Sequence, residues 1–171
     1  NENIVVPKLS AVRINNTEEY IQAIISFLKP KKFVSKVVLD TTRSSVLTPV
    51  LVLFSRLGIN YSLVKSNHLG NPLLPQNRKD LATAVIKNKA DLGIIWDSDG
   101  DRVIFVDRLG NLIPLSFVLG ILGAKEITPK NNKIAVDVRA GLVVRDLVKA
   151  AGGQLEIFPA WSQYIKFGMQ T

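Results

Sequence analysis

The sequence predicts an α/β protein: a three-layer αβα domain with a mostly parallel mixed sheet, followed by a truncated second α/β unit. Short apolar runs alternate along the chain with segments of helical periodicity, which is the pattern of strands connected by helices. Hydrophobic residues make up 47% of the 171 residues, enough for a substantial core. The chain has no Cys, which excludes a disulfide scaffold and a thiolate zinc site.

The first elements establish the alternation. Residues 18–28 carry apolar side chains at helical spacing, and residues 36–40 form an apolar run that is typical of a buried strand. Residues 48–57 predict a second helix, which stops at Gly58 in a C-terminal capping position. Residues 59–65 then predict the next strand of the sheet.

Two further strands enclose an acidic loop. A loop with Gly, Asn and Pro precedes a predicted helix over residues 77–88. The apolar runs at residues 90–96 and 102–107 predict strands, and the acidic residues lie between them. Residues 109–111 then predict a turn, and residues 115–124 a helix.

The pattern restarts after a polar segment at residues 128–132, which is typical of a linker. Strands are predicted over residues 134–137 and 155–158, with a helix over residues 142–151 between them. We therefore expect one domain over residues 1–127 and the start of a second over residues 128–171. The second unit has too few elements to close a layer, so we expect a domain cut short.

No apolar stretch approaches the ~18 residues needed to cross a membrane, and the N-terminus lacks the features of a signal peptide. We therefore expect no membrane partner, and the absence of Cys is compatible with the cytoplasm. Residue 1 is not Met, so we expect that the natural chain begins further upstream.

Charge is unevenly distributed along the sequence. Residues 1–90 hold 13 basic and 5 acidic residues, whereas residues 91–171 hold 9 of each. A basic first half could attract a phosphorylated metabolite, nucleic acid or an acidic partner, although charge alone favours a solvated surface. Aromatic residues are not interleaved with the basic ones, so we expect no nucleic-acid partner.

Asp97, Asp99 and Asp101 follow directly after an apolar strand, in a short loop that contains Gly100. Carboxylates that converge repel one another unless a positive charge neutralises them, and Mg²⁺ prefers oxygen ligands. Arg102 comes next and offers a fork of donors for a phosphate beside the metal. The sequence therefore indicates a magnesium site at the carboxyl end of this strand.

Two other interpretations of the loop compete with the magnesium site. A solvated acidic turn is the usual meaning of such a sequence, but a surface turn does not need three carboxylates at the end of a buried strand. An EF-hand calcium loop fails because Arg102 stands where Gly is required and Arg108 where a bidentate Glu is required. A phosphoryl-transfer metal site fits the position best, since ligands of open α/β sheets bind at the carboxyl ends of strands.

Residues 97–102 resemble the Asp-Gly-Asp-Gly-Asp-Arg magnesium loop of the α-D-phosphohexomutases, the phosphoglucomutase and phosphomannomutase group. The likeness continues on both sides, through residues 71–94 before the loop and 106–110 after it. Residues 137–139, 152–153 and 164–166 resemble the opening of that family's next domain. The resemblance covers most of the chain from about Lys36 onward, as the second domain and the start of the third.

The resemblance implies an intramolecular phosphotransferase that interconverts hexose 1-phosphate and hexose 6-phosphate through a phosphorylated serine. The chain has no match to that serine motif, because Ser44 and Ser45 have the pattern of a helix entrance. The resemblance thus implies a fragment that supplies the metal site, is inactive alone, and depends on the missing domains of the parent enzyme.

The resemblance also implies roles for individual residues. Asp97, Asp99 and Asp101 would hold Mg²⁺, and Arg102 would stabilise phosphate charge. Arg139 falls where the family often places a cationic residue that faces the active site. Its alternative is an exposed Arg at a helix entrance.

Some positions depart from the family pattern or match it weakly. Ser98 replaces the usual Gly or Pro-type residue of the loop, and Gln163 stands where many members have His. Since Gln163 cannot exchange protons near neutral pH, no acid or base role is expected there. His68 matches a loop His of some members, but an exposed loop His explains it better.

Two alternatives of other classes stay open at this stage. The first is a haloacid-dehalogenase-like phosphatase with Asp97 as nucleophile and Asp99 as acid, although Asp101 replaces a helpful Thr or Val. The second is a non-enzymatic binding module that uses the basic residues 1–90.

Overall fold

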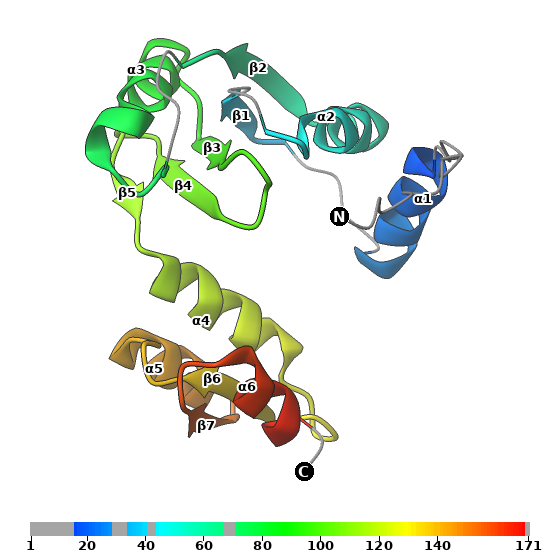
Figure 1. The fold of residues 1–171 in the computed structure, drawn as a ribbon, viewed down its shortest axis with the longest axis vertical. Helices are drawn as coiled ribbons and strands as arrows, with labels where there is room; N and C mark the ends of the chain where they lie inside the picture. The colour runs from blue at the N-terminus through cyan, green and yellow to red at the C-terminus, as the bar shows by residue number, and fades with distance from the viewer. Residues whose placement is uncertain (1–15, 29–33, 41–43, 67–70, 170–171) are drawn as a thin grey trace, which may run out of the picture.

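The computed structural model describes residues 16–28, 34–40, 44–66 and 71–169. These residues form two units, each with its own sheet. Helix α4 (Leu115–Glu126) runs from the first unit into the second (Figure 1).

The first unit is built on a five-stranded sheet with the strand order β2-β1-β3-β4-β5. Its strands are β1 (Lys36–Asp40), β2 (Asn60–Val64), β3 (Leu92–Trp96), β4 (Val103–Asp107) and β5 (Leu112–Ile113). Strands β2 and β3 both run parallel to β1, one on each side of it, whereas β4 and β5 add antiparallel pairs. The chain thus winds to one side of β1 and then to the other, which creates a topological switch point between β1 and β3.

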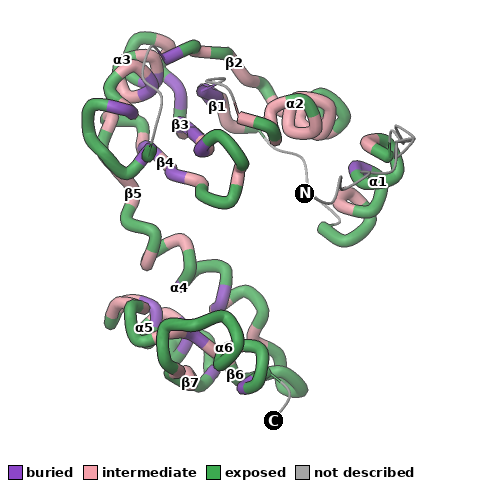
Figure 2. Tube along the Cα trace, viewed as in Figure 1, coloured by how far each residue is buried: buried purple, intermediate pink, exposed green. Residues whose placement is uncertain are grey.

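Helices cover both faces of this sheet. Helix α2 (Leu47–Arg56) packs on the face that carries Val37 and Leu39. Helix α3 (Lys79–Lys87) packs on the opposite face, which carries Val38. Successive residues of a strand point to opposite faces, so β1 contributes to both cores, and its last four residues are all buried (Figure 2). The predicted three-layer α/β class with a mixed sheet is confirmed.

Helix α1 (Thr17–Leu28) lies against α2 and extends the layer on that side of the sheet. Ile21 is the buried residue of α1. At the helix surface, Arg56 Nη2 lies 2.7 Å from Glu18 Oε2 in an exposed ion pair. Exposed pairs contribute little, so burial of Ile21 dominates the attachment of α1.

The second unit contains two parallel strands, β6 (Lys133–Asp137) and β7 (Gln154–Phe158). Helix α5 (Leu142–Ala150) connects them, and α6 (Ser162–Gly168) follows β7. The core of the unit is small and is formed by Val136, Val144 and Val148 with partly buried neighbours.

Helix α4 packs on α5 and therefore belongs structurally to the second unit. A Cβ atom on Gly120 would lie 2.6 Å from Leu147 Cδ1 and 3.3 Å from Val144 Cα, so the glycine allows the two helices to approach closely. The sequence places the domain boundary at residues 127/128. The packing of α4 argues for a boundary before Leu115, and we propose that position instead.

Most element boundaries differ from the sequence predictions by one or two residues. The helix predicted over residues 77–88 begins as a 3₁₀ turn, η1 (Pro75–Arg78), and becomes α-helical at Lys79. Strand β5 has two residues, too few to produce a periodic signal. Within the described ranges, no helix combines the length and the apolar character that a membrane span requires.

Candidate metal centre

The acidic loop lies at the switch point of the first sheet. It begins at Asp97, directly after β3, and leads into β4 at Val103. Strand β3 is hydrogen-bonded to β1 in parallel register, so residues that follow β1 and β3 reach the same edge of the sheet. Open α/β sheets bind their ligands at this kind of edge.

Asp97 folds the loop from within. Its Oδ1 accepts hydrogen bonds from the backbone N–H groups of Gly100 and Arg102, each at 3.1 Å. The Asp97 N–H in turn donates to the Arg102 carbonyl oxygen at 3.2 Å, which closes the loop. Gly100 has a φ of +77°, in the left-handed region that favours glycine.

The loop brings the three predicted carboxylates together. One carboxylate oxygen each from Asp97, Asp99 and Asp101 lie within 4.8 Å of one another. Asp97 is buried, whereas Asp99 and Asp101 are exposed, so the group opens toward solvent. Asp97 Oδ1 is committed to the backbone, which leaves Oδ2 directed toward its charged neighbours.

The crowding of negative charge changes how these carboxyls titrate. A hydrogen bond with Asp97 and the charge of Asp99 raise the pKa of Asp101 above its usual value. Desolvation acts to raise the pKa of Asp97, but the Arg102 N–H, the Asp101 hydrogen bond and the Arg102 charge lower it overall. The carboxyls of Asp97 and Asp101 therefore influence each other's ionisation, and a cation bound between them would compete with protons.

Arg102 places a positive charge beside the three carboxylates. Its Nε lies 3.6 Å from both Asp97 Oδ2 and Asp101 Oδ1. Its side chain is 55% exposed, so these pairs are loose and solvent-screened. The guanidinium is therefore available to an anion that approaches the loop.

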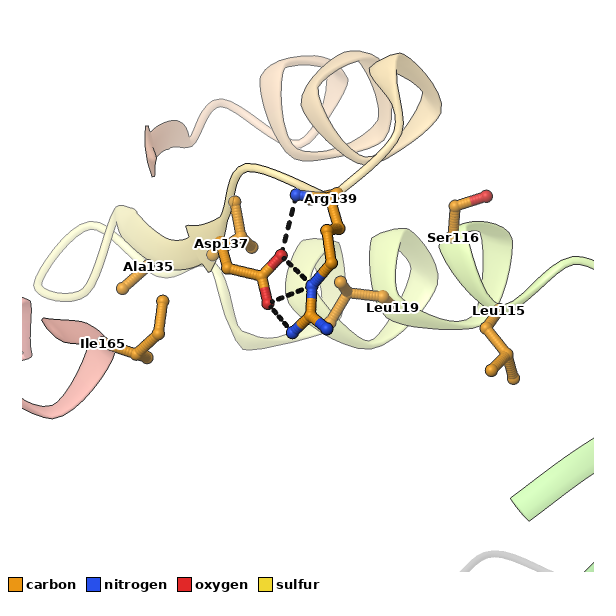
Figure 3. A pocket seen from close by; sticks show the side chains of 9 residues that line it. Leu115, Ser116, Leu119, Ala135, Asp137, Arg139 and Ile165 are labelled. Carbon is orange, nitrogen blue, oxygen red and sulfur yellow. Dashed lines mark hydrogen bonds and ion pairs between the residues drawn. The ribbon is translucent and has the colours of Figure 1, made fainter. Parts of the chain in front are cut away.

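Arg139 lies in the second unit, after β6, and not in the acidic loop. Its Nε is 3.1 Å from both carboxylate oxygens of Asp137, and its backbone N–H donates to Asp137 Oδ1 at 2.8 Å. This pairing lowers the pKa of Asp137 and raises that of Arg139. Arg139 borders a cavity of about 390 Å³ with mainly apolar walls, including Leu119 and Ile165 (Figure 3).

Other residues singled out in the sequence contribute less to the geometry. Gln163 lies on α6 in the second unit. His68 falls outside the described residues. Ser98 occupies the loop without disturbing the convergence of the carboxylates, and its carbonyl oxygen accepts a hydrogen bond from Ser45 N–H at 2.9 Å.

Ser45 contacts the acidic loop, which the sequence analysis did not predict. It follows β1, 54 residues before Asp99, and its Oγ donates to the Asp99 carbonyl oxygen at 3.1 Å. The helix-entrance pattern around it gave no local signal of this contact. Only the parallel pairing of β1 with β3 could have predicted it.

Known proteins resemble the chain in sequence and in fold. A family model described as "Phosphoglucomutase/phosphomannomutase, alpha/beta/alpha domain II" matches residues 18–110. This range contains the complete acidic loop and ends before α4.

Individual relatives extend the match into the second unit. The chain is 31% identical, over 173 aligned positions, to a phosphomannomutase of Escherichia coli strain K12, covering 92% of this chain and 38% of the relative. A Xanthomonas campestris relative described as "Phosphohexose mutases" is 36% identical over 107 residues, 61% of this chain and 24% of the relative. The chain thus spans less than two fifths of the length of these curated relatives.

The fold has solved counterparts. The crystal structure of a phosphoglucomutase/phosphomannomutase family protein from Burkholderia thailandensis superimposes with a TM-score of 0.80 at 21% identity, covering 91% of this chain and 36% of that chain. At that identity the likeness supports the fold of both units.

Proposed function

The chain belongs to the phosphoglucomutase/phosphomannomutase family, and on that premise we propose that it supplies the metal-binding part of a phosphohexomutase. The reaction is the interconversion of a hexose 1-phosphate and a hexose 6-phosphate by phosphoryl transfer through a phosphoserine enzyme. The chain would contribute the acidic loop after β3, and other parts of the parent enzyme would contribute the nucleophile and the sugar contacts.

The observation that carries this proposal is the convergence of Asp97, Asp99 and Asp101 at the switch point of the sheet. Three carboxylate oxygens within 4.8 Å form a donor set that suits a hard divalent cation, since Mg²⁺ and Ca²⁺ select oxygen ligands. The hydrogen bond with Asp97 and the charge of Asp99 raise the pKa of Asp101, so a cation beside these carboxylates would favour their ionised forms. The residues therefore fit Mg²⁺.

Each residue has a defined part in this proposal. Asp97, Asp99 and Asp101 would hold the ion, and Asp97 would also keep the loop folded through Gly100 and Arg102. When bound, Mg²⁺ would supply positive charge that stabilises the phosphoryl group during its transfer. Arg102 would orient and neutralise phosphate oxygens beside the ion.

Arg139 would serve the same anionic substrate from the second unit. Asp137 occupies one side of its guanidinium, which fixes the group in place and leaves its other donors for a ligand. The apolar cavity beside it could accommodate the carbon face of a sugar. This role requires that the parent enzyme bring the two units around one substrate.

Metal binding is the first test of the proposal. The full chain titrated with Mn²⁺, as a spectroscopic substitute for Mg²⁺, should bind one ion weakly, with a Kd of roughly 0.1–1 mM, because three carboxylates form an incomplete site. Asp99→Asn should weaken binding, and the matched control Asp91→Asn, outside the loop, should not. Submicromolar Mg²⁺ binding would contradict the idea of a site that needs a phosphate to complete it.

Inactivity of the isolated chain is the second test. The chain alone should not convert glucose 1-phosphate or mannose 1-phosphate to the 6-phosphate, because it has no match to the serine motif. Trapping experiments should detect no aspartyl-phosphate at Asp97. A covalent phosphate on Asp97 would instead favour the phosphatase mechanism, in which that residue is the nucleophile.

We propose neither a nucleic-acid nor a membrane partner for the chain. The excess of basic residues within positions 1–90 would then interact with solvent or with a phosphorylated substrate. A gel shift with nucleic acid at physiological salt should show no retardation. Retardation that weakens steeply with salt would favour the binding-module alternative.

A further inference from the structure

The acidic loop is held from outside as well as from within, and the external support comes from residues 44–46, which we name the brace. The brace follows β1 and leads into α2, so it lies beside the loop because β1 and β3 are neighbours in the sheet. Within the loop, the Oδ1 atom of Asp97 fixes the backbone at Gly100 and Arg102.

Ser45 supplies the bonds that hold the loop at Ser98 and Asp99. Its N–H donates to the Ser98 carbonyl oxygen at 2.9 Å, and its Oγ donates to the Asp99 carbonyl oxygen at 3.1 Å. Two consecutive peptide carbonyls are thereby held by one residue. Since the Asp99 carboxylate is exposed, its position depends on its backbone, and Ser45 orients that backbone.

Val46 adds a steric contact at the next residue of the loop. A Cβ atom on Gly100 would lie 2.3 Å from Val46 Cγ1, so the glycine backbone packs directly against the valine. The brace itself is anchored, because the Val46 carbonyl oxygen accepts the N–H of Val50 at 3.0 Å. Val50 lies in α2 and packs on the core of the sheet.

We infer that Ser45 is a positioning residue for the metal centre: it holds the loop at the Ser98 and Asp99 carbonyls, so that the Asp99 carboxylate meets those of its two acidic neighbours. This inference rests on the proposed function, since it assigns Ser45 to a metal site. It adds a residue far from the loop in sequence, on an element that otherwise serves as the entrance of α2.

Ser44, also in the brace, provides a matched control for Ser45. Ser44 is adjacent to Ser45, but its Oγ is buried and has no hydrogen-bond partner within the described part of the chain. Removal of the Ser44 hydroxyl therefore breaks no bond to the acidic loop. Ser44→Ala and Ser45→Ala delete the same atom from neighbouring positions, and only the second deletion releases the Asp99 carbonyl.

The test is a Mn²⁺ titration of the full chain and three variants, at a temperature where circular dichroism shows all of them folded. Ser45→Ala should bind Mn²⁺ about fivefold more weakly, as expected for the loss of one hydrogen bond. Ser45→Thr keeps the hydroxyl at an exposed position and should restore the affinity, while Ser44→Ala should bind as the unmodified chain does.

The outcomes separate this inference from the proposed function. If the unmodified chain binds no Mn²⁺ at the loop, the metal site itself is wrong. If it binds Mn²⁺ and Ser45→Ala binds equally well, the site stands and the positioning role of Ser45 is wrong. Equal weakening by Ser44→Ala and Ser45→Ala would also overturn the inference, because it would indicate a general disturbance of the brace.

Discussion

Two turns of the first unit are closed by nearly the same backbone hydrogen bonds, but they differ in the charges that surround the first Asp. The acidic loop connects β3 to β4, and residues 107–111 connect β4 to β5. Each begins with an Asp whose Oδ1 accepts two backbone N–H groups, and in each the Asp N–H bonds back across the turn. Each contains a glycine in the left-handed region, with φ of +77° at Gly100 and +82° at Gly110.

The turns differ in what surrounds the first Asp. The pKa of Asp107 is lowered by the backbone N–H groups of Asn111 and Leu109 and by the charge of Arg108, so its ionised carboxylate is stabilised in the turn. In the acidic loop, a second carboxyl is held so close that the pKa of Asp101 rises. One Asp is therefore enough to close each of these turns. The carboxylates of Asp99 and Asp101 are therefore not what closes the acidic loop.

The largest difference between the turns should appear in metal binding. Replacing both Asp99 and Asp101 with Asn removes two of the three proposed ligands, and should weaken Mn²⁺ binding by roughly 100-fold, at about tenfold for each carboxylate. Asp107→Asn should leave the affinity unchanged. Isothermal titration of the two variants checks this, and equal losses in both would break the distinction.

Substituting alanine for Gly100 should lower the free energy of unfolding more than the same substitution at Gly110. Both positions carry a left-handed φ, which costs a non-glycine residue about 1–2 kcal/mol. At Gly110 the added Cβ meets Ile86 Cδ1, the end of a flexible side chain, at 2.9 Å. At Gly100 it meets the stiff Val46 side chain at 2.3 Å, so Gly100→Ala should cost about 1–3 kcal/mol more.

Urea denaturation of both alanine variants measures this difference. The double variant Gly100→Ala with Val46→Ala should relieve part of the steric cost and keep the conformational cost. Equal losses of unfolding free energy at Gly100 and Gly110 would show that Val46 does not support the loop.

Two carboxyls of these turns, Asp107 and Asp101, should respond to pH with opposite signs, whereas Asp97, whose pKa is also lowered, should follow Asp107. The folded-state pKa of Asp107 lies below its unfolded value, so its stabilising contribution is present above the unfolded pKa and is lost as pH falls through the folded pKa. The folded-state pKa of Asp101 lies above its unfolded value, so ionised Asp101 destabilises the fold, which regains stability as pH falls through that pKa.

Unfolding measured from roughly pH 3 to pH 7 without metal tests both signs, because the carboxyl groups titrate in that range. Asp107→Asn should reduce the loss of stability in acid, and Asp101→Asn should increase stability near neutral pH. A destabilised Asp101→Asn variant at pH 7 would contradict the account of charge crowding.

The smallest effect should come from the side chain of Asn111. Its Nδ2 lies 3.4 Å from Asp107 Oδ2 at an exposed position, whereas its backbone N–H makes the shorter bond to Asp107 at 2.8 Å. Asn111→Ala keeps the backbone bond and should cost no more than about 0.5 kcal/mol. Thermal unfolding checks this, and a larger loss would show that this turn depends on side chains as well.

The sequence predicted those features that local patterns encode. The alternation of apolar runs and helical periodicity predicted the α/β class, and the spacing of Asp97, Asp99 and Asp101 predicted that their carboxylates converge. Both are properties of short segments. The family resemblance agrees with the match over residues 18–110, while the roles of Arg102 and Arg139 stay predictions.

Contacts between residues that are far apart in the sequence could not be predicted from such local patterns. The bond from Ser45 to Asp99 exists because β1 and β3 pair, and no periodicity near Ser45 indicates it. Helix α4 joins the second unit because Gly120 fits against Leu147, a contact between separate helices. The polar linker after α4 marked a plausible boundary, but it did not show on which core α4 packs.

The most direct measurement for the central claim is paramagnetic broadening by Mn²⁺ in the amide NMR spectrum of the ¹⁵N-labelled chain. If the three carboxylates form one cation site, substoichiometric Mn²⁺ should first broaden the amides of residues 97–102 and of the brace, and leave residues 107–111 sharper. Broadening that starts at residues 107–111, or that spreads evenly over all exposed carboxylates, would contradict a site at the end of β3.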